Sequence, residues 1–202
     1  MGALAHASRS VFGTALLALS VIRASAQSDL TRGDSARLAR MIALADLPAG
    51  SRMLSEHADG SGVVRRRFTV GTVAIYLSLY EFPSDSARDA SFGPAVTAEM
   101  AAESFRSLVQ QRGFVVEGIR AEAFTMDSLG PYRRGFVVSG TMTSSGLRYT
   151  HAYVMLDRPT TSLFIQVEGL GTALEVRGLL QTLALRSASR LELAVGQPNG
   201  GW

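Results

Sequence analysis

Apolar residues recur along this chain with two different periods, which predict helices and strands. Near residue 40 they follow the three- and four-residue spacing of one helix face, in the set Leu38, Met41, Ile42 and Ala45. Pro48 ends this helix, because proline disfavours helical geometry in the residue before it. Residues 51 to 57 and 63 to 82 alternate instead with a period of two, which predicts strands with a turn at Gly71.

A second amphipathic helix is expected in the middle of the chain. Residues 83 to 89 form a polar break, after which Pro94 stands in the first turn of a helix that extends to Arg112. Gly113 follows as the left-handed residue at which helices commonly stop. Residues 114 to 116 then predict a short strand.

The last third of the chain predicts a hairpin, a strand and a helix. The hairpin covers residues 134 to 156 with its turn at residues 144 to 146, and a further strand covers residues 163 to 168. Thr172 and Glu175 have the spacing of a capping box, which marks the start of a helix. An apolar stripe continues that helix, in the set Val176, Leu179, Leu180 and Leu183.

The order of these elements predicts an α+β fold. Helix, strands, helix, strands and helix follow one another with mostly hairpin-type links, which favours a mostly antiparallel sheet flanked by helices. We place an N-terminal helical segment at residues 27–46, one globular domain at residues 47–186 and a C-terminal tail at residues 187–202. The globular part is long enough to bury a real apolar core.

The first 26 residues have the order of a secretory signal peptide. A run of 12 mostly apolar residues from Val11 to Ile22 precedes Arg23, and Ala24 and Ala26 are the small residues that a signal peptidase accepts. The run is too short to span a membrane, which takes about 20 residues. We therefore expect cleavage after Ala26 and a periplasmic or extracellular protein without a membrane span in its mature form.

The composition narrows the choice of partners. The chain contains no cysteine, so it cannot be a lipoprotein, and its stability depends on an apolar core rather than on disulfides. Loss of Arg9 and Arg23 with the signal leaves 18 basic residues against 17 acidic ones, a net charge of +1. This balance provides little of the counterion release that drives nucleic-acid binding. We expect no nucleic-acid partner.

Two groups of residues are candidates for binding. In the run Arg65-Arg66-Arg67, the outer two side chains share one face of a strand and could hold a carboxylate or phosphate. Tyr149, His151 and Tyr153 also share a strand face, either as a packed aromatic strip under a helix or as part of a ligand pocket. No cofactor is implied by either group.

Motifs for catalysis and for metals are sparse. Glu56, His57 and Asp59 could supply metal ligands, but such a cluster in a loop is normally solvated, and we predict no metal site. Residues 144 to 146 lack the spacing of a nucleophile elbow. Residues 169 to 171 lack the third glycine of a dinucleotide fingerprint, and the chain has no lysine for a phosphate loop.

The layout resembles that of the PsbP-like superfamily of α/β/α sandwiches. The resemblance covers residues 47 to 186 and depends on six segments, namely Leu47-Pro48-Ala49-Gly50, residues 63 to 82, residues 95 to 112, Gly135 to Val138 with Gly146 to Tyr149, Ser162 to Val167, and Leu179 to Leu183. It implies an α/β/α sandwich and, for function, an accessory or binding role without catalysis. It implies no particular partner, because fold analogy alone does not choose one.

Two functions remain open at this stage. The first is an exported binding or accessory module that engages a protein or a small ligand of the cell envelope. The second is a periplasmic hydrolase whose acid and base would be drawn from Glu56, Asp59, Asp127 and His151. Convergence of carboxylates and a histidine in one concave pocket would favour the enzyme, and a pocket without them would favour the binding module.

Overall fold

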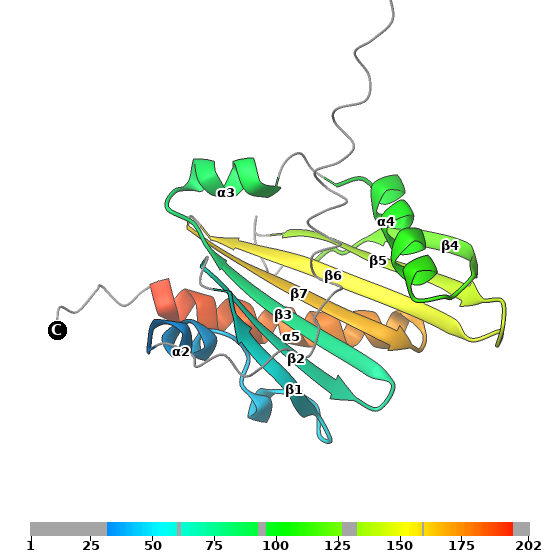
Figure 1. Ribbon diagram of the computed structural model, residues 1–202, viewed down its shortest axis with the longest axis horizontal. Helices are drawn as coiled ribbons and strands as arrows, with labels where there is room; N and C mark the ends of the chain where they lie inside the picture. Colours follow the sequence, from blue (N-terminus) through cyan, green and yellow to red (C-terminus); the bar gives the residue numbers. More distant parts are fainter. Residues whose placement is uncertain (1–31, 60–61, 93–95, 127–132, 159, 196–202) are drawn as a thin grey trace, which may run out of the picture.

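The computed structural model describes residues 32–59, 62–92, 96–126, 133–158 and 160–195 (Figure 1). Their central feature is one seven-stranded sheet in the order β1-β2-β3-β7-β6-β5-β4, in which every neighbouring pair is antiparallel. The strands are β1 (Arg52–Ala58), β2 (Val63–Val70), β3 (Val73–Glu81), β4 (Val116–Ala123), β5 (Arg133–Met142), β6 (Arg148–Arg158) and β7 (Thr161–Leu170). The expected α+β class with an antiparallel sheet is confirmed.

Helices pack on both faces of this sheet. The long helix α5 (Ala173–Val195) and the short helix α2 (Arg32–Ala39) lie on one face, and α4 (Ala98–Gln111) lies on the other over β4 and β5 (Figure 1). Two separate buried clusters reflect this arrangement. One joins α2 and α5 to the sheet, and the other joins α4 to the opposite face.

Strands β6 and β7 separate the two clusters by strict alternation. In β7, Leu163 and Ile165 belong to the α5 cluster, whereas Phe164 between them belongs to the α4 cluster. In β6, Ala152 and Tyr153 divide in the same way. Successive side chains of a strand point to opposite faces, so these central strands are buried on both sides.

Local sequence signals agree with several of the observed boundaries. Gly71 and Gly113 have φ values of 55° and 78°, the left-handed conformation that the turn and the helix stop require. The capping box also forms, because the Glu175 amide donates to the Thr172 hydroxyl while the Glu175 carboxylate accepts from the Thr172 amide. These signals act within a few residues, which is why they could be interpreted from the sequence.

Three boundaries differ from the sequence-based expectation. The segment expected as a polar break contains a short helix, α3 (Asp85–Phe92), whose first turn is capped by the Ser84 hydroxyl. The short strand expected at residues 114 to 116 is β4, which begins at Val116. The N-terminal helix stops at Ala39, and a 3-10 turn η1 (Leu44–Asp46) follows, although Met41 and Ile42 are buried as expected.

The C-terminal boundary is also later than expected. The expected tail began at residue 187, but α5 continues to Val195. Ser187 and Leu191 are buried and extend the stripe of Leu180 and Ala184 at helical spacing, so the helix keeps its contact with the sheet. The expected signal peptide lies outside the described residues.

Candidate functional site

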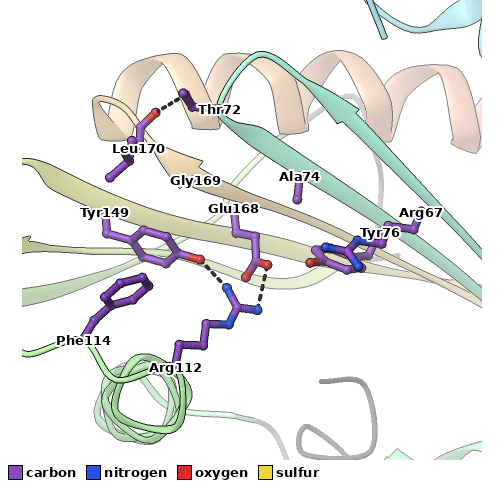
Figure 2. A pocket seen from close by; sticks show the side chains of 10 residues that line it. All are labelled: Arg67, Thr72, Ala74, Tyr76, Arg112, Phe114, Tyr149, Glu168, Gly169 and Leu170. Carbon is purple, nitrogen blue, oxygen red and sulfur yellow. Dashed lines mark hydrogen bonds and ion pairs between the residues drawn. The ribbon is translucent and has the colours of Figure 1, made fainter. Parts of the chain in front are cut away.

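A pocket opens on the α4 face of the sheet, beside the part that α4 covers. Its volume is about 440 Å³, within the range of about 300–1,000 Å³ typical of small-molecule sites. Strands β2, β3, β6 and β7, the β2–β3 turn and the segment after α4 supply its walls (Figure 2). The lining residues are Arg67, Thr72, Ala74, Tyr76, Arg112, Phe114, Tyr149, Glu168, Gly169 and Leu170.

The strand register explains why these residues meet. Arg67 pairs with Tyr76, and Ala74 pairs with Glu168, so the side chains follow two neighbouring rows across the sheet. Each row points to the α4 face because side-chain direction alternates along every strand. Arg112 reaches the pocket from the end of α4, the helix that packs over β4 and β5.

Glu168 is the buried carboxylate at the centre of the site. Its side chain is 5% exposed, and it accepts a hydrogen bond of 2.8 Å from the Arg112 guanidinium (Figure 2). Tyr76 and Tyr149 also interact electrostatically with this carboxylate, and Arg112 donates a hydrogen bond to the Tyr149 hydroxyl oxygen. The Arg112 guanidinium therefore compensates the buried charge of Glu168.

The charges around Glu168 keep it ionised. Burial alone would raise the pKa of Glu168, but the nearby His151 and the hydrogen bonds from Arg112 and Tyr76 outweigh it, and the pKa is lowered. Complete burial lowers the pKa of His151, and the neighbouring charge of Glu168 partly opposes this shift. Glu168 is therefore a weak base that is already paired with Arg112.

The two tyrosines are held in their neutral form. Burial, with the charge of Glu168 as the next cause, raises the pKa of Tyr76 to about 12. The same causes raise the pKa of Tyr149. Neither phenol can act as a base or nucleophile near neutral pH, because the phenolate is scarcely populated. Both act as hydrogen-bond donors.

Arg67 differs from its two neighbours in β2. Arg65 pairs with Asp59 at 3.1 Å, and Arg66 pairs with Glu56 at 3.3 Å on the opposite face. Arg67 instead lies over the Tyr76 ring, with its guanidinium carbon 5.2 Å from the ring centroid. Among the described residues no ion pair joins Arg67 to a carboxylate, whereas its buried Nε lacks a hydrogen-bond partner just as those of Arg65 and Arg66 do.

The sequence-predicted binding residues are only partly brought together. Arg67 and Tyr149 line the pocket, whereas Arg65 shares their face of the sheet but is paired with Asp59. His151 is 3% exposed, and its Nε2 lies 3.1 Å from Nε2 of Gln166. Tyr153 is packed in the α4 cluster, where burial raises its pKa. His151 and Tyr153 are therefore packed side chains under a helix, the first of the two alternatives given for the aromatic strip.

The residues considered for a hydrolase do not converge. Glu56 pairs with Arg66 on the face opposite His151, and Asp59 lies at the end of the β1–β2 hairpin, on the edge pair of the sheet. Asp127 lies outside the described residues. His151 does have Glu168 as its cross-strand neighbour, but it is buried and is not part of the pocket wall. Among the described residues that line this pocket, no carboxylate stands beside a histidine as an acid–base pair.

The described residues hold neither a metal-binding cluster nor a membrane-spanning helix. Within residues 32–195, apart from the undescribed gaps, no group of three or more acidic or histidine side chains is placed to hold a metal ion. None of the described helices combines the length and the apolar character needed to cross a bilayer.

Sequence reasoning missed three of the ionisable residues that line the pocket, Tyr76, Arg112 and Glu168. Glu168 could have been found from the sequence, because it is a glutamate near the end of β7, a strand that is otherwise apolar and buried. A buried carboxylate needs a cation nearby, so its position indicates a partner arginine. Arg112 gave no such signal. It is 56 residues away from Glu168 in the sequence, and only the packing of α4 brings the two together.

Comparisons with known proteins provide no family for this chain. No family model and no curated protein matches it. Among solved structures, it is similar to the crystal structure of the extracellular domain of PknH from Mycobacterium tuberculosis, with 7% sequence identity and a TM-score of 0.45. The similarity covers 80% of this chain and 100% of that domain.

Proposed function

We propose that this protein is an exported, non-catalytic binding or accessory protein that holds a small ligand in the pocket beside α4. The observation that carries the proposal is the chemistry of the pocket wall. Among the described residues of this wall, the ionisable side chains other than Glu168 are hydrogen-bond donors, and Glu168, their one carboxylate, is already paired with Arg112. Such a wall suits recognition better than proton transfer.

Three further points support this proposal. Export is inferred from the signal-like order of the first 26 residues. The resemblance to PsbP-like proteins, which is part of the proposal, implies an accessory role as well. The pocket is also built on strands rather than on mobile loops, and a site on a rigid sheet is preorganised for its ligand.

A blocking substitution tests the use of the pocket. Ala74 lies on β3 in the pocket wall, so Ala74→Phe places an aromatic ring in the space that a ligand would occupy. The mature protein and this variant would be screened by thermal shift against a library of small organic molecules. We expect ligands that stabilise the unmodified protein and leave the variant unaffected.

The control is Ala123→Phe, an alanine of β4 that is exposed and does not line the pocket. It should respond to the same ligands as the unmodified protein. Absence of any stabilising ligand, or equal responses from Ala74→Phe and the unmodified protein, would refute the pocket as the binding site. Hydrolysis of library esters or phosphoesters that Ala74→Phe abolishes would favour the hydrolase instead.

A further inference from the structure

We infer that the pocket recognises a monocarboxylate joined to an apolar body, and that Arg67 is the residue that binds the carboxylate. The inference rests on the proposed function, because it names the class of ligand for the same pocket. It depends on three features of the described residues: the balance of charge, the state of the Arg67 side chain, and the apolar part of the wall.

The pocket carries one more positive than negative charge. Of the residues that the structure describes, Arg67 and Arg112 line it, and Glu168 is the one acidic residue in its wall. Arg112 lies between Glu168 and the Tyr149 hydroxyl and donates to both, so its charge is already offset. The charge of Arg67 is the one left for an incoming anion.

Arg67 is held ready to bind that anion. Its position in the middle of β2 and its stacking over Tyr76 restrict the side chain before any ligand arrives. Its Nε is buried without a hydrogen-bond partner, as are those of Arg65 and Arg66, but of these three arginines Arg67 is the one that lines the pocket. Leaving a buried donor unpaired costs a protein free energy. A carboxylate that accepts from the guanidinium edge, in the two-bond geometry that arginine favours, would relieve this cost.

The rest of the wall favours an apolar ligand body and a single negative charge. Ala74, Phe114 and Leu170 line the pocket beside the polar residues. Burying an apolar group against them removes its surface from water, which stabilises the complex. A phosphate with two negative charges would exceed the one free positive charge and would lie in the field of Glu168.

The experiment uses matched ligand pairs. Binding of 4-phenylbutyrate, hexanoate and benzoate would be measured by NMR titration of the mature protein, alongside their neutral amides and phenyl phosphate. We expect at least one carboxylate to bind at least about tenfold more tightly than its amide and than phenyl phosphate, since a hydrogen bond to a charged group contributes about 1.5–3 kcal/mol.

Two arginine variants test which positive charge binds the carboxylate. Arg67→Ala should weaken carboxylate binding by about 10- to 100-fold and leave the affinity for the amides unchanged, since only the charged contact is lost. Arg65→Ala is the matched control, because Arg65 lies two residues away on the same face but is paired with Asp59. It should bind the carboxylates as the unmodified protein does.

The outcomes separate this inference from the proposed function. Equal affinity for carboxylates and amides, tighter binding of phenyl phosphate, or unchanged carboxylate binding by Arg67→Ala would overturn the inference. The proposed pocket would still stand if Ala74→Phe abolished the binding of other ligands. If Arg65→Ala lost as much carboxylate binding as Arg67→Ala, the inference about Arg67 would also be overturned, because the loss would then be a general effect of surface charge.

Discussion

Replacing Arg112 by alanine tests the idea that Glu168 is a buried charge held by one principal cation. The variant leaves the Glu168 carboxylate, whose side chain is 5% exposed, without the guanidinium that now lies 2.8 Å away. Removing one partner of a fully buried ion pair costs about 3–5 kcal/mol. Because the Arg112 side chain is 32% exposed and water can enter the pocket, we reduce the expected loss to about 2–3 kcal/mol.

The pH dependence of this loss is distinctive. In the unmodified protein the pKa of Glu168 is lowered, so its stabilising contribution is present above the unfolded value of about 4.3 and is lost as pH falls through the folded value. In Arg112→Ala, burial dominates and raises the pKa of the carboxyl. At low pH the Glu168 carboxyl of the variant is protonated, which removes the cost of a buried unpaired charge. The difference in the free energy of unfolding between the two proteins therefore narrows.

Urea unfolding followed by far-ultraviolet circular dichroism, at pH 7 and at pH 4, measures both effects. At pH 7 the free energy of unfolding should fall by about 2–3 kcal/mol, which corresponds to about 4–12 °C in Tm for a chain of this size. The control is Arg106→Ala, which removes an ion pair with Glu103 on the exposed side of α4 and should cost less than about 0.5 kcal/mol. A loss in Arg112→Ala as small as that of the control, or one that does not shrink at pH 4, would refute the reasoning.

Three other predictions follow from the described packing and from the sequence. Gly135→Ala should destabilise the protein by more than about 2 kcal/mol, because the new Cβ would lie 2.3 Å from the Tyr153 carbonyl oxygen. Gly178→Ala in α5 is the control, because its new Cβ meets no atom within 4 Å, and it should stabilise the protein by about 0.5–1 kcal/mol. Equal melting temperatures of the two variants would contradict this prediction. Because burial lowers the pKa of His151, stability should decline as pH falls below the unfolded value of about 6.5, and His151→Gln should show a shallower decline between pH 7 and pH 5 in chemical denaturation. Mass spectrometry of the protein expressed with its own N-terminus in a secreting host should show cleavage after Ala26, and an uncleaved chain would contradict the signal peptide.

The candidate site shows where sequence reasoning reached its limit. The shared strand face of Arg65 and Arg67 was predictable, because alternation is a property of a single strand. Their different roles were not, since Asp59 reaches Arg65 through the β1–β2 pairing and leaves Arg67 facing the pocket. The burial of Tyr153 likewise depends on α4, which is distant in the sequence.

The sequence by itself determined the features that depend on near neighbours. The period of two in β2 and β3, the Thr172–Glu175 cap and the left-handed stop at Gly113 are all set within a few residues. The α+β class followed from the order of such segments.

Only the tertiary structure decided the strand order, the faces that the helices cover and the pocket. Pairing of β3 with β7 places Ala74 opposite Glu168, and packing of α4 brings Arg112 to that carboxylate. Contacts between such distant segments depend on the closure of long loops and on the burial of both sheet faces together. The pattern of residues along the chain contains no information on loop closure or on joint burial of the two faces. The site could therefore be identified only from the assembled sheet.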